Sequence, residues 1–288
     1  MTRAAGNRRG EQLVIDPRLA RHLGDADPFD SCMSLQGEPI RQAPGRRTVR
    51  FTVDGQGYYA KIHSGVGWRE IFKNLSQLRR PVLGADVERD AISRVTQLGI
   101  RTTPVVAHGC RGRNPAARES FLITSDIGPT ISLEQLAEPA SDHGIDLNLK
   151  RRIINQVARI VRTLHTNGIN HRDLYLCHFE MDRHLDARSA PGKLCLMDLH
   201  RAQLRPRVPH RWLVKDLAAL LFSSLDAPLT HRDLLRFVRM YRQAPLSASL
   251  KADARLWRQV WQRAMRLYRS HWNRTPSAPA YNAAGCDK

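Results

Sequence analysis

The chain has 288 residues, of which 42% are hydrophobic, and its formal net charge is +19. This length and composition exclude an intrinsically disordered chain and are typical of one large two-lobed unit or two small domains. No apolar run approaches the roughly 20 residues of a membrane-spanning helix, and the polar, basic first residues predict no secretory signal. We therefore expect a cytosolic protein.

The positive charge is carried mainly by arginine, which supplies 39 of the 46 basic residues. Arginine suits phosphate groups because its planar fork pairs with two oxygens at once. The charge favours an anionic partner: phosphorylated lipid, a membrane surface, an acidic protein or nucleic acid. Codon bias in a GC-rich genome is the alternative explanation. The five cysteines are scattered without CxxC pairs, which predicts reduced thiols rather than disulfides or a zinc site.

The first part of the chain is predicted to form an arm followed by strands. Residues 1–28 are polar and basic, which is typical of a loose arm, and Leu19–Leu23 is expected to be a short docking segment within it. Thr48–Val53 alternates, Asp54–Gly57 is a tight turn, and Tyr58–Ile62 completes a β-hairpin. Lys61 lies near the end of the second strand of this hairpin.

A basic insert, Trp68–Arg80, precedes a helix that is predicted from about Gly84 to Leu98 and carries Glu88. Beyond this helix the sequence predicts the strands Val105–His108 and Ser120–Thr124 and the connector Ser125-Asp126-Ile127-Gly128. A polar linker then leads into a helix from about Leu147 that ends at Gly168, with apolar residues at helical spacing.

His171-Arg172-Asp173 follows this helix directly and is the triplet of the protein-kinase catalytic loop. In that loop the Asp accepts the proton of an attacking hydroxyl, and a residue five positions later holds a metal ion. That residue is His178 here, where most kinases have Asn. Because three residues recur by chance, the assignment depends on finding the other kinase parts in the right order.

Those parts are present in kinase order. Asp198 follows a short apolar strand and has the position of the metal-binding Asp, although Leu199-His200 replaces the usual Phe-Gly. A kinase lysine on the third strand contacts the nucleotide phosphates and is held by a helix Glu, which predicts the pair Lys61 and Glu88. Ordinary surface charges are the alternative for both residues.

The nucleotide-binding connector and the phosphate loop are less distinct. Ser125, Asp126 and Ile127 fit a hinge whose backbone groups bind adenine. A GxGxxG loop is missing, and the corresponding turn lies between Ser34 and Gly45.

The end of the chain combines basic and apolar segments. A basic run consists of Arg201, Arg205, Arg207 and Arg211. Asp216 begins an apolar helix and is predicted to brace the catalytic loop, with a simple helix N-terminal charge as the alternative. The last helix, about Ser249 to Trp272, carries an aromatic stripe that predicts core packing or, alternatively, an anionic membrane contact.

From roughly Phe29 to Arg242 the chain resembles the heptose(I) kinases, a family of bacterial lipopolysaccharide core kinases. The segments that carry the resemblance are Tyr59-Ala60-Lys61-Ile62-His63, Pro81-Val82-Leu83-Gly84-Ala85-Asp86, Phe121-Leu122-Ile123-Thr124, Pro129-Thr130-Ile131-Ser132-Leu133, Gly168-Ile169-Asn170-His171-Arg172-Asp173, Cys177-His178-Phe179 and Asp198-Leu199-His200-Arg201-Ala202-Gln203. His178 and the Leu199-His200 pair follow the pattern of this family.

The resemblance implies an α+β, bilobal protein-kinase-like fold. We expect a small β-rich N-lobe over residues 29–127, a larger helical C-lobe over residues 128–275, and a flexible tail over residues 276–288. It also implies ATP-dependent phosphorylation of a hydroxyl of the first heptose of the inner core, with ATP and Mg²⁺ as cofactors.

The site residues implied by the resemblance fall into five groups. They are Asp173 and Arg172 for catalysis; Lys61, Glu88, Ser125, Asp126 and Ile127 for the nucleotide; Asp198 and His178 for the metal; His200 and Arg201 for the acceptor; and His171 and Asp216 for structural support.

The expected partners are the nascent, lipid-linked lipopolysaccharide core and the anionic inner face of the bacterial inner membrane. The charge also fits an acidic carrier protein or lipid, and no specific nucleic acid is expected. Two alternatives remain open at this point. One is an aminoglycoside-type phosphotransferase for a soluble small molecule, and the other is a non-catalytic, pseudokinase-like module that binds anions.

Overall fold

The structure is a computed structural model that describes residues 11–24, 26–65, 67–76, 84–138, 146–183 and 194–276. The chain divides into two units. The first comprises Met1–Arg94 and Thr102–Gly128, and the second comprises Val95–Arg101 and Pro129–Lys288. None of the helices in the described ranges is long and apolar enough to cross a membrane.

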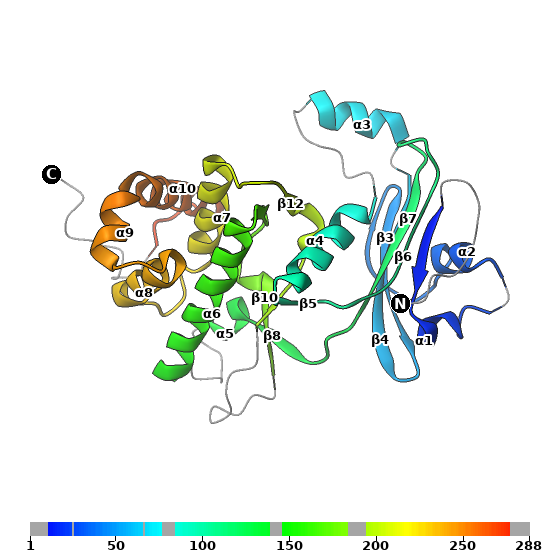
Figure 1. The fold of residues 1–288 in the computed structure, drawn as a ribbon, viewed down its shortest axis with the longest axis horizontal. Helices are drawn as coiled ribbons and strands as arrows, with labels where there is room; N and C mark the ends of the chain where they lie inside the picture. Colours follow the sequence, from blue (N-terminus) through cyan, green and yellow to red (C-terminus); the bar gives the residue numbers. More distant parts are fainter. Residues whose placement is uncertain are drawn as a thin grey trace. The chain divides into compact units, whose positions relative to one another are not determined.

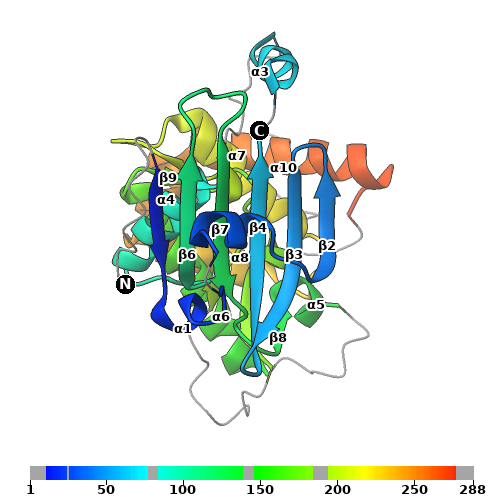
Figure 2. The same cartoon turned by 90° about the vertical axis from the view of Figure 1, so that its right-hand side faces the viewer.

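The first unit is built on a six-stranded antiparallel sheet with the strand order β1-β6-β7-β4-β3-β2 (Figure 2). Its strands are β1 (Gln12–Ile15), β2 (Glu38–Ala43), β3 (Arg46–Val53), β4 (Gln56–Ser64), β6 (Val105–Arg111) and β7 (Glu119–Ser125). The predicted hairpin is confirmed, because β3 pairs with β4 from Arg46↔His63 to Val53↔Gln56. Asp54 and Gly55 both have positive φ angles, as a tight hairpin turn of this kind requires.

Short helices cover one face of this sheet and close its core. The helices of the first unit are α1 (Pro17–Ala20), α2 (Pro28–Met33), α3 (Gly67–Ser76) and α4 (Asp86–Gln97), the last of which ends in the second unit. Leu19 of α1 and Phe29 of α2 are buried together with Ile62 and Ile123 of the sheet. Figure 2 shows α1 and α2 in front of the strands.

The loose arm predicted over residues 1–28 differs from the structure. Gln12–Ile15 forms β1, which pairs with β6, and Leu13 and Ile15 are buried in the core. Arg111 of β6 strengthens this attachment, because its guanidinium lies 2.9 Å from Glu11 and 2.9 Å from Asp27. The four-residue apolar pattern was too short to stand out within a polar segment. Residues 1–10 lie outside the described ranges.

The second unit is mainly helical and carries small sheets (Figure 1). Its helices are α5 (Leu133–Leu136), α6 (Leu147–Thr166), α7 (His210–Ser223), α8 (His231–Arg242), α9 (Leu246–Ala252) and α10 (Ala254–Trp272). α6 packs against α8, and α7 packs against α10. The prediction of a helix from about Leu147 is confirmed, with Asp146 accepting a hydrogen bond from the Leu149 N–H as its N-cap.

Short strands and 3₁₀ turns connect these helices. One sheet has the order β5-β11-β10-β8, and β12 pairs with β9. Their bounds are β5 (Arg101–Thr102), β8 (Thr130–Ser132), β9 (Ile169–Asn170), β10 (Phe179–Asp182), β11 (Cys195–Leu196) and β12 (Gln203–Leu204), and the 3₁₀ turns are η1 (Leu176–His178) and η2 (Leu199–Arg201). The predicted mixed α+β fold class is therefore confirmed, with the β-rich part first and the helical part second.

The predicted last helix is divided into α9 and α10, which separate at Asp253. Its buried face also differs from the predicted aromatic stripe. Leu256, Val260, Ala264 and Tyr268 are buried, whereas Trp272 is 51% exposed. Spacing of four residues places these buried side chains on one face, and the bulkier tryptophans lie beside it. The tail beyond residue 276 is outside the described residues.

Gly168 shows why the chain turns sharply before the catalytic loop. Its φ angle is +76°, and a Cβ atom built there would lie 1.7 Å from the carbonyl oxygen of Arg205. The backbone approaches so closely because the Arg205 N–H donates a hydrogen bond of 2.9 Å to the Gly168 carbonyl. We therefore expect Gly168→Ala to lower the free energy of unfolding by about 2–4 kcal/mol, measured by urea denaturation.

Gly99 offers a matched control for this substitution. It has the same φ angle of +76°, but a Cβ atom added there would point into open space. Gly99→Ala should therefore cost only the backbone part, about 1–2 kcal/mol. Equal losses in the two variants would show that the contact with Arg205 contributes nothing.

Candidate active site

The residues predicted for the site are divided between the two units. Lys61, Glu88 and the hinge belong to the first unit, and the catalytic loop and Asp198 belong to the second.

In the first unit, Lys61 and Glu88 form the predicted ion pair. The Lys61 Nζ atom lies 2.5 Å from Glu88 Oε1, and the Glu88 side chain is only 9% exposed. Ala60 and Ile62 are buried in the core on either side of Lys61, so strand alternation directs the lysine to the other face of the sheet. A buried carboxylate needs a partner, and this pairing fixes the position of the lysine side chain.

The three predicted hinge residues differ in which backbone N–H and C=O groups remain free to bind a ligand. The N–H of Ser125 donates to Pro104, and that of Asp126 donates to Gly57, each at 2.9 Å. The Asp126 carboxylate accepts a hydrogen bond from Arg50 at 3.2 Å. Within the described ranges the backbone of Ile127 makes no hydrogen bond. Of the three predicted residues, Ile127 is therefore the one whose N–H and C=O can both bind a nucleotide base.

In the second unit, Asp216 of α7 holds the backbone of the catalytic loop in place. This fully buried carboxylate of α7 accepts hydrogen bonds from the N–H of His171 at 2.7 Å and from that of Arg172 at 2.9 Å. Arg172 has a φ angle of +76°, a left-handed conformation that costs of order 1–3 kcal/mol for such a residue. The paired hydrogen bonds compensate for this strain. His165, which the sequence did not single out, lies 3.3 Å from the same carboxylate.

His171 links the loop to the segment before Asp198. Its Nε2 atom lies 3.0 Å from the carbonyl oxygen of Met197, and its ring stacks on His178 with centroids 5.7 Å apart. Burial lowers the pKa of His171, so the ring is held as a neutral imidazole. His171 therefore supports the loop and is too deeply buried to meet a substrate.

Asp173 is paired with Arg201, which the sequence had assigned to the acceptor. Arg201 Nη1 lies 2.8 Å from Asp173 Oδ1 and 2.9 Å from Oδ2. The carboxylate is only 17% exposed, whereas Arg201 is 43% exposed. The guanidinium therefore orients the candidate base. This contact joins residues 28 positions apart in the sequence, and local patterns carry no signal for it.

Asp198 lies between two imidazoles. His200 Nδ1 forms a short hydrogen bond with Asp198 Oδ1, and His178 Nε2 lies 3.6 Å from Oδ2. His178 Nδ1 lies 2.7 Å from the Asp173 carbonyl oxygen and must be its donor, because a carbonyl only accepts. In a neutral His178 ring, Nε2 would then direct its lone pair toward the carboxylate. His200 thus contacts Asp198 rather than projecting freely toward an acceptor.

Asp198 and His178 fit a magnesium ion that takes most of its ligands from substrate phosphates and water. Within the described residues no group of three or more His, Cys, Asp or Glu side chains could hold a metal. Mg²⁺ is commonly bound through one or two carboxylates together with substrate phosphates and water. Asp198 would supply one carboxylate, and the His178 nitrogen would be a weaker second ligand because Mg²⁺ prefers oxygen.

The backbone at Asp198 is strained like that at Arg172. Its φ angle is +58°, and the other non-glycine residues with positive φ in the described ranges lie in a turn or at helix ends: Asp54, Gln243 and Asn273. Two strained positions in one constellation are typical of a functional site.

The cysteines near this loop are inert. Burial raises the pKa of both Cys177 and Cys195 to about 11, so their thiols are protonated at neutral pH. The prediction of reduced thiols is confirmed for the four described cysteines, which are all free.

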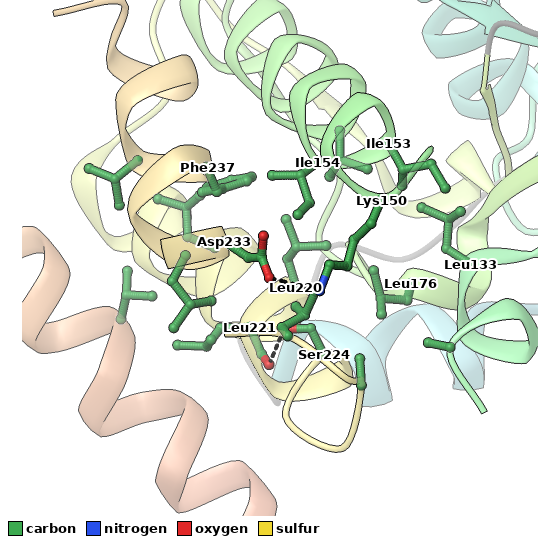
Figure 3. A pocket seen from close by; sticks show the side chains of 18 of the residues that line it. Leu133, Lys150, Ile153, Ile154, Leu176, Leu220, Leu221, Ser224, Asp233 and Phe237 are labelled. Atoms are coloured by element: carbon green, nitrogen blue, oxygen red, sulfur yellow. Dashed lines mark hydrogen bonds and ion pairs between the residues drawn. The ribbon is translucent and has the colours of Figure 1, made fainter. Parts of the chain in front are cut away.

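The second unit also encloses an apolar cavity that the sequence analysis missed (Figure 3). Its volume is about 280 Å³, and α5 to α10 all contribute to its wall. Figure 3 shows Ile154, Leu220 and Phe237 around it, and Lys150 with Asp233 at its border. The Lys150 Nζ atom lies 3.1 Å from Asp233 Oδ2.

Residues 30–241 match the model of the lipopolysaccharide kinase (Kdo/WaaP) family. The chain is 43% identical over 257 residues to the lipopolysaccharide core heptose(I) kinase WaaP of Pseudomonas aeruginosa, covering 89% of this chain and 96% of that protein. It is 46% identical over 241 residues to the WaaP protein of Escherichia coli, covering 84% of this chain and 91% of that protein.

The structure also resembles a solved one, described as WaaP in complex with acyl carrier protein. The TM-score is 0.77 at 39% sequence identity, and the likeness covers 89% of this chain and 99% of that chain. The predicted kinase-like fold is therefore confirmed. Together with the family match over residues 30–241, these likenesses show that the chain belongs to the lipopolysaccharide kinase (Kdo/WaaP) family.

Proposed function

We propose that this protein transfers the γ-phosphoryl group of ATP to a hydroxyl of the first heptose of the lipopolysaccharide inner core. The relatives at 43–46% identity are named as kinases of that heptose. The observation that carries the proposal is the catalytic loop, in which Asp216 braces His171 and Arg172 so that Asp173 follows them in a fixed turn.

The residues of the first unit would bind the nucleotide. Lys61 would contact the phosphates, and its ion pair with Glu88 would keep the amine in place. The free backbone groups of Ile127 would bind adenine. Positioning of this kind is the main contribution that proteins make to phosphoryl transfer.

The residues of the second unit would act on the acceptor and the metal. Asp173 would accept the proton of the sugar hydroxyl. At the same time the hydroxyl oxygen would bond to the γ-phosphorus, and the bond from that phosphorus to the ADP oxygen would break. Asp198, assisted by His178, would hold Mg²⁺, which when bound neutralises negative charge on the phosphates. Arg201 would hold the Asp173 carboxylate toward the hydroxyl.

The acceptor is lipid-linked, so the reaction would take place at the cytoplasmic face of the inner membrane. The net charge of +19 favours a peripheral position on that anionic surface. No specific nucleic acid partner is proposed.

Transfer of ³²P from [γ-³²P]ATP to core lipopolysaccharide that lacks heptose phosphate tests this function. We expect label on the core only when Mg²⁺ is present, and none on free heptose or aminoglycosides. Preferential labelling of the soluble acceptors would favour the small-molecule phosphotransferase. If no acceptor is labelled and ATP with Mg²⁺ gives no thermal shift, a non-catalytic module is the better description.

We further propose that the second unit binds an acyl carrier protein and that the acyl chain enters the apolar cavity. The solved relative is described as a complex with this partner. A cavity of about 280 Å³ with an apolar wall suits a hydrocarbon chain, and the positive net charge suits an acidic carrier.

Filling the cavity should abolish the contribution of the acyl chain to carrier binding. At about 100 times its dissociation constant, a carrier loaded with a long acyl chain should raise the melting temperature by about 5–10 °C, whereas the unacylated carrier should have little effect. In Ala227→Phe the new ring would occupy the cavity, and we expect the dependence on the acyl chain to disappear, measured by differential scanning fluorimetry.

Ala254→Leu is the matched control, because Ala254 is exposed at the start of α10. It should keep the full response to the acylated carrier. A wild-type protein that responds equally to acylated and unacylated carriers would refute the role of the cavity.

A further inference from the structure

Trp212 of α7 is surrounded by positive charge. Lys215 Nζ lies 4.2 Å from the centroid of the Trp212 ring, and the guanidinium carbons of Arg172, Arg211 and Arg205 lie at 5.2, 5.7 and 5.8 Å. Arg201 and Arg263 are added because their charges act on Lys215. We call the whole set the Trp212 cluster: Trp212 with Arg172, Arg201, Arg205, Arg211, Lys215 and Arg263.

The members of this cluster repel one another. Partial burial is the main cause that lowers the pKa of Lys215, and the charges of Arg263, Arg172, Arg211 and Arg201 lower it further. Burial and the charge of Arg201 likewise lower the pKa of Arg172. Like charges gathered at a partly buried place destabilise the fold unless a ligand of opposite charge is bound among them.

Few acids in the described part of the chain compensate for this charge. Among the described residues Asp173 forms an ion pair with Arg201, and the fully buried Asp216 accepts from the loop amides; both carboxylates act on Arg172, and burial with the charge of Arg201 outweighs them. No ion pair joins Arg172, Arg205, Arg211, Lys215 or Arg263 to an acid among the described residues. The nearest partner of Arg205 is the neutral Gln203 side chain, at 2.5 Å.

Several donors in the cluster are also buried without a hydrogen-bond partner within the described ranges. They are the Nε atoms of Arg172, Arg205 and Arg263 and the Nε1 atom of Trp212. A buried donor left unpaired is costly, and a bound oxyanion would accept from such groups. The exposed side chains of Arg201 and Arg211 would leave the cluster open to a ligand.

We propose that the Trp212 cluster binds an oxyanion group of the acceptor, a carboxylate or a phosphate, beside the hydroxyl that is phosphorylated. This inference rests on the proposed function for the identity of the acceptor. Arg172 directly precedes Asp173, and Arg201 contacts it, so the cluster borders the candidate base. The bound anion would orient the acceptor, and the cluster would also reduce the repulsion between an acidic acceptor and the nucleotide phosphates.

Lys215→Met tests the proposal, because Lys215 makes no ion pair or hydrogen bond with the candidate base Asp173 among the described residues, and methionine keeps its length. For an acceptor that carries acidic groups near the heptose, we expect KM to rise about 10–100-fold while kcat changes less than threefold. KM for ATP should be unchanged, and Lys215→Arg should restore the wild-type value. Because it relieves repulsion, Lys215→Met should keep or raise the melting temperature.

Two acceptor arms identify the anion, and a matched variant controls for charge. One acceptor carries only carboxylates as its acidic groups, and the other carries only phosphates. The acceptor whose KM rises in Lys215→Met identifies the bound group. Lys251→Met, an exposed lysine of α9, should leave both KM values unchanged. An equal rise in KM for an uncharged acceptor, or no rise for either acidic one, would overturn the proposal.

Direct binding separates this inference from the proposed function. Inorganic phosphate should raise the melting temperature of the wild-type protein and of Lys251→Met, but raise it less in Lys215→Met. If Lys215→Met shows the smaller phosphate-induced shift in melting temperature although no heptose acceptor is phosphorylated, the anion site is supported. In that case only its assignment to the heptose acceptor is refuted. Equal shifts in all three proteins would mean that the cluster binds no anion.

Discussion

Asp173→Asn should lower kcat for phosphoryl transfer by about 10²–10⁴-fold and leave the dissociation constant for ATP within about threefold. The amide cannot take the hydroxyl proton, and it loses the ion pair with Arg201 that orients the side chain. The nucleotide contacts assigned to Lys61 and Ile127 are not altered. Single-turnover transfer and isothermal titration with ATP measure the two quantities separately.

Arg201→Met distinguishes the chemical role of Asp173 from its orientation. The carboxylate remains in this variant but loses its partner, so we expect a smaller loss of kcat, about tenfold. Asp182→Asn is a control outside the site, because Asp182 pairs with Arg101 at 2.7 Å and should leave kcat unchanged. An Asp173→Asn enzyme within tenfold of wild type would show that another group accepts the proton.

Lys61→Met should lower kcat/KM for ATP by about 10²–10³-fold, because the amine that contacts the phosphates is removed. It should also lower the free energy of unfolding by about 1–3 kcal/mol, because Glu88 would remain buried without its partner. Steady-state kinetics and urea denaturation measure the two effects.

The double variant Lys61→Met/Glu88→Gln separates these effects. A neutral glutamine tolerates burial better than an unpaired carboxylate, so stability should return toward the wild-type value while activity stays low. If activity returned together with stability, Lys61 would have only a structural role.

The resemblance of several sequence segments to the heptose(I) kinases was sufficient to predict the family and the fold class, and the order of the kinase motifs predicted the Lys61–Glu88 pair. The pair depends on spacing along the chain and on local patterns such as strand alternation and helix ends. The hairpin at Asp54 and the helix from Leu147 were predictable for the same reason.

The remaining features depend on contacts between distant segments. The pairing of Arg201 with Asp173 and the strand at Gln12–Ile15 require partners far along the chain. The sequence therefore left Arg201 as a candidate for holding either the loop or the acceptor, and the composition of the first residues suggested a loose arm. The cavity arises where six helices fail to fill a common space, and no single helix reveals it. Likewise, the basic run was visible in the sequence, but its gathering around Trp212 was not.

A single turn of α7 carries Trp212, Lys215 and Asp216. Under the further inference, Trp212 and Lys215 of this turn would bind the acid of the acceptor, while Asp216 holds the loop that presents Asp173. The turn would then fix the distance between the bound anionic group of the acceptor and the hydroxyl oxygen that is phosphorylated. Under the proposed function, regioselectivity among the hydroxyls of one sugar would be set by the length of a helical turn rather than by recognition of each hydroxyl.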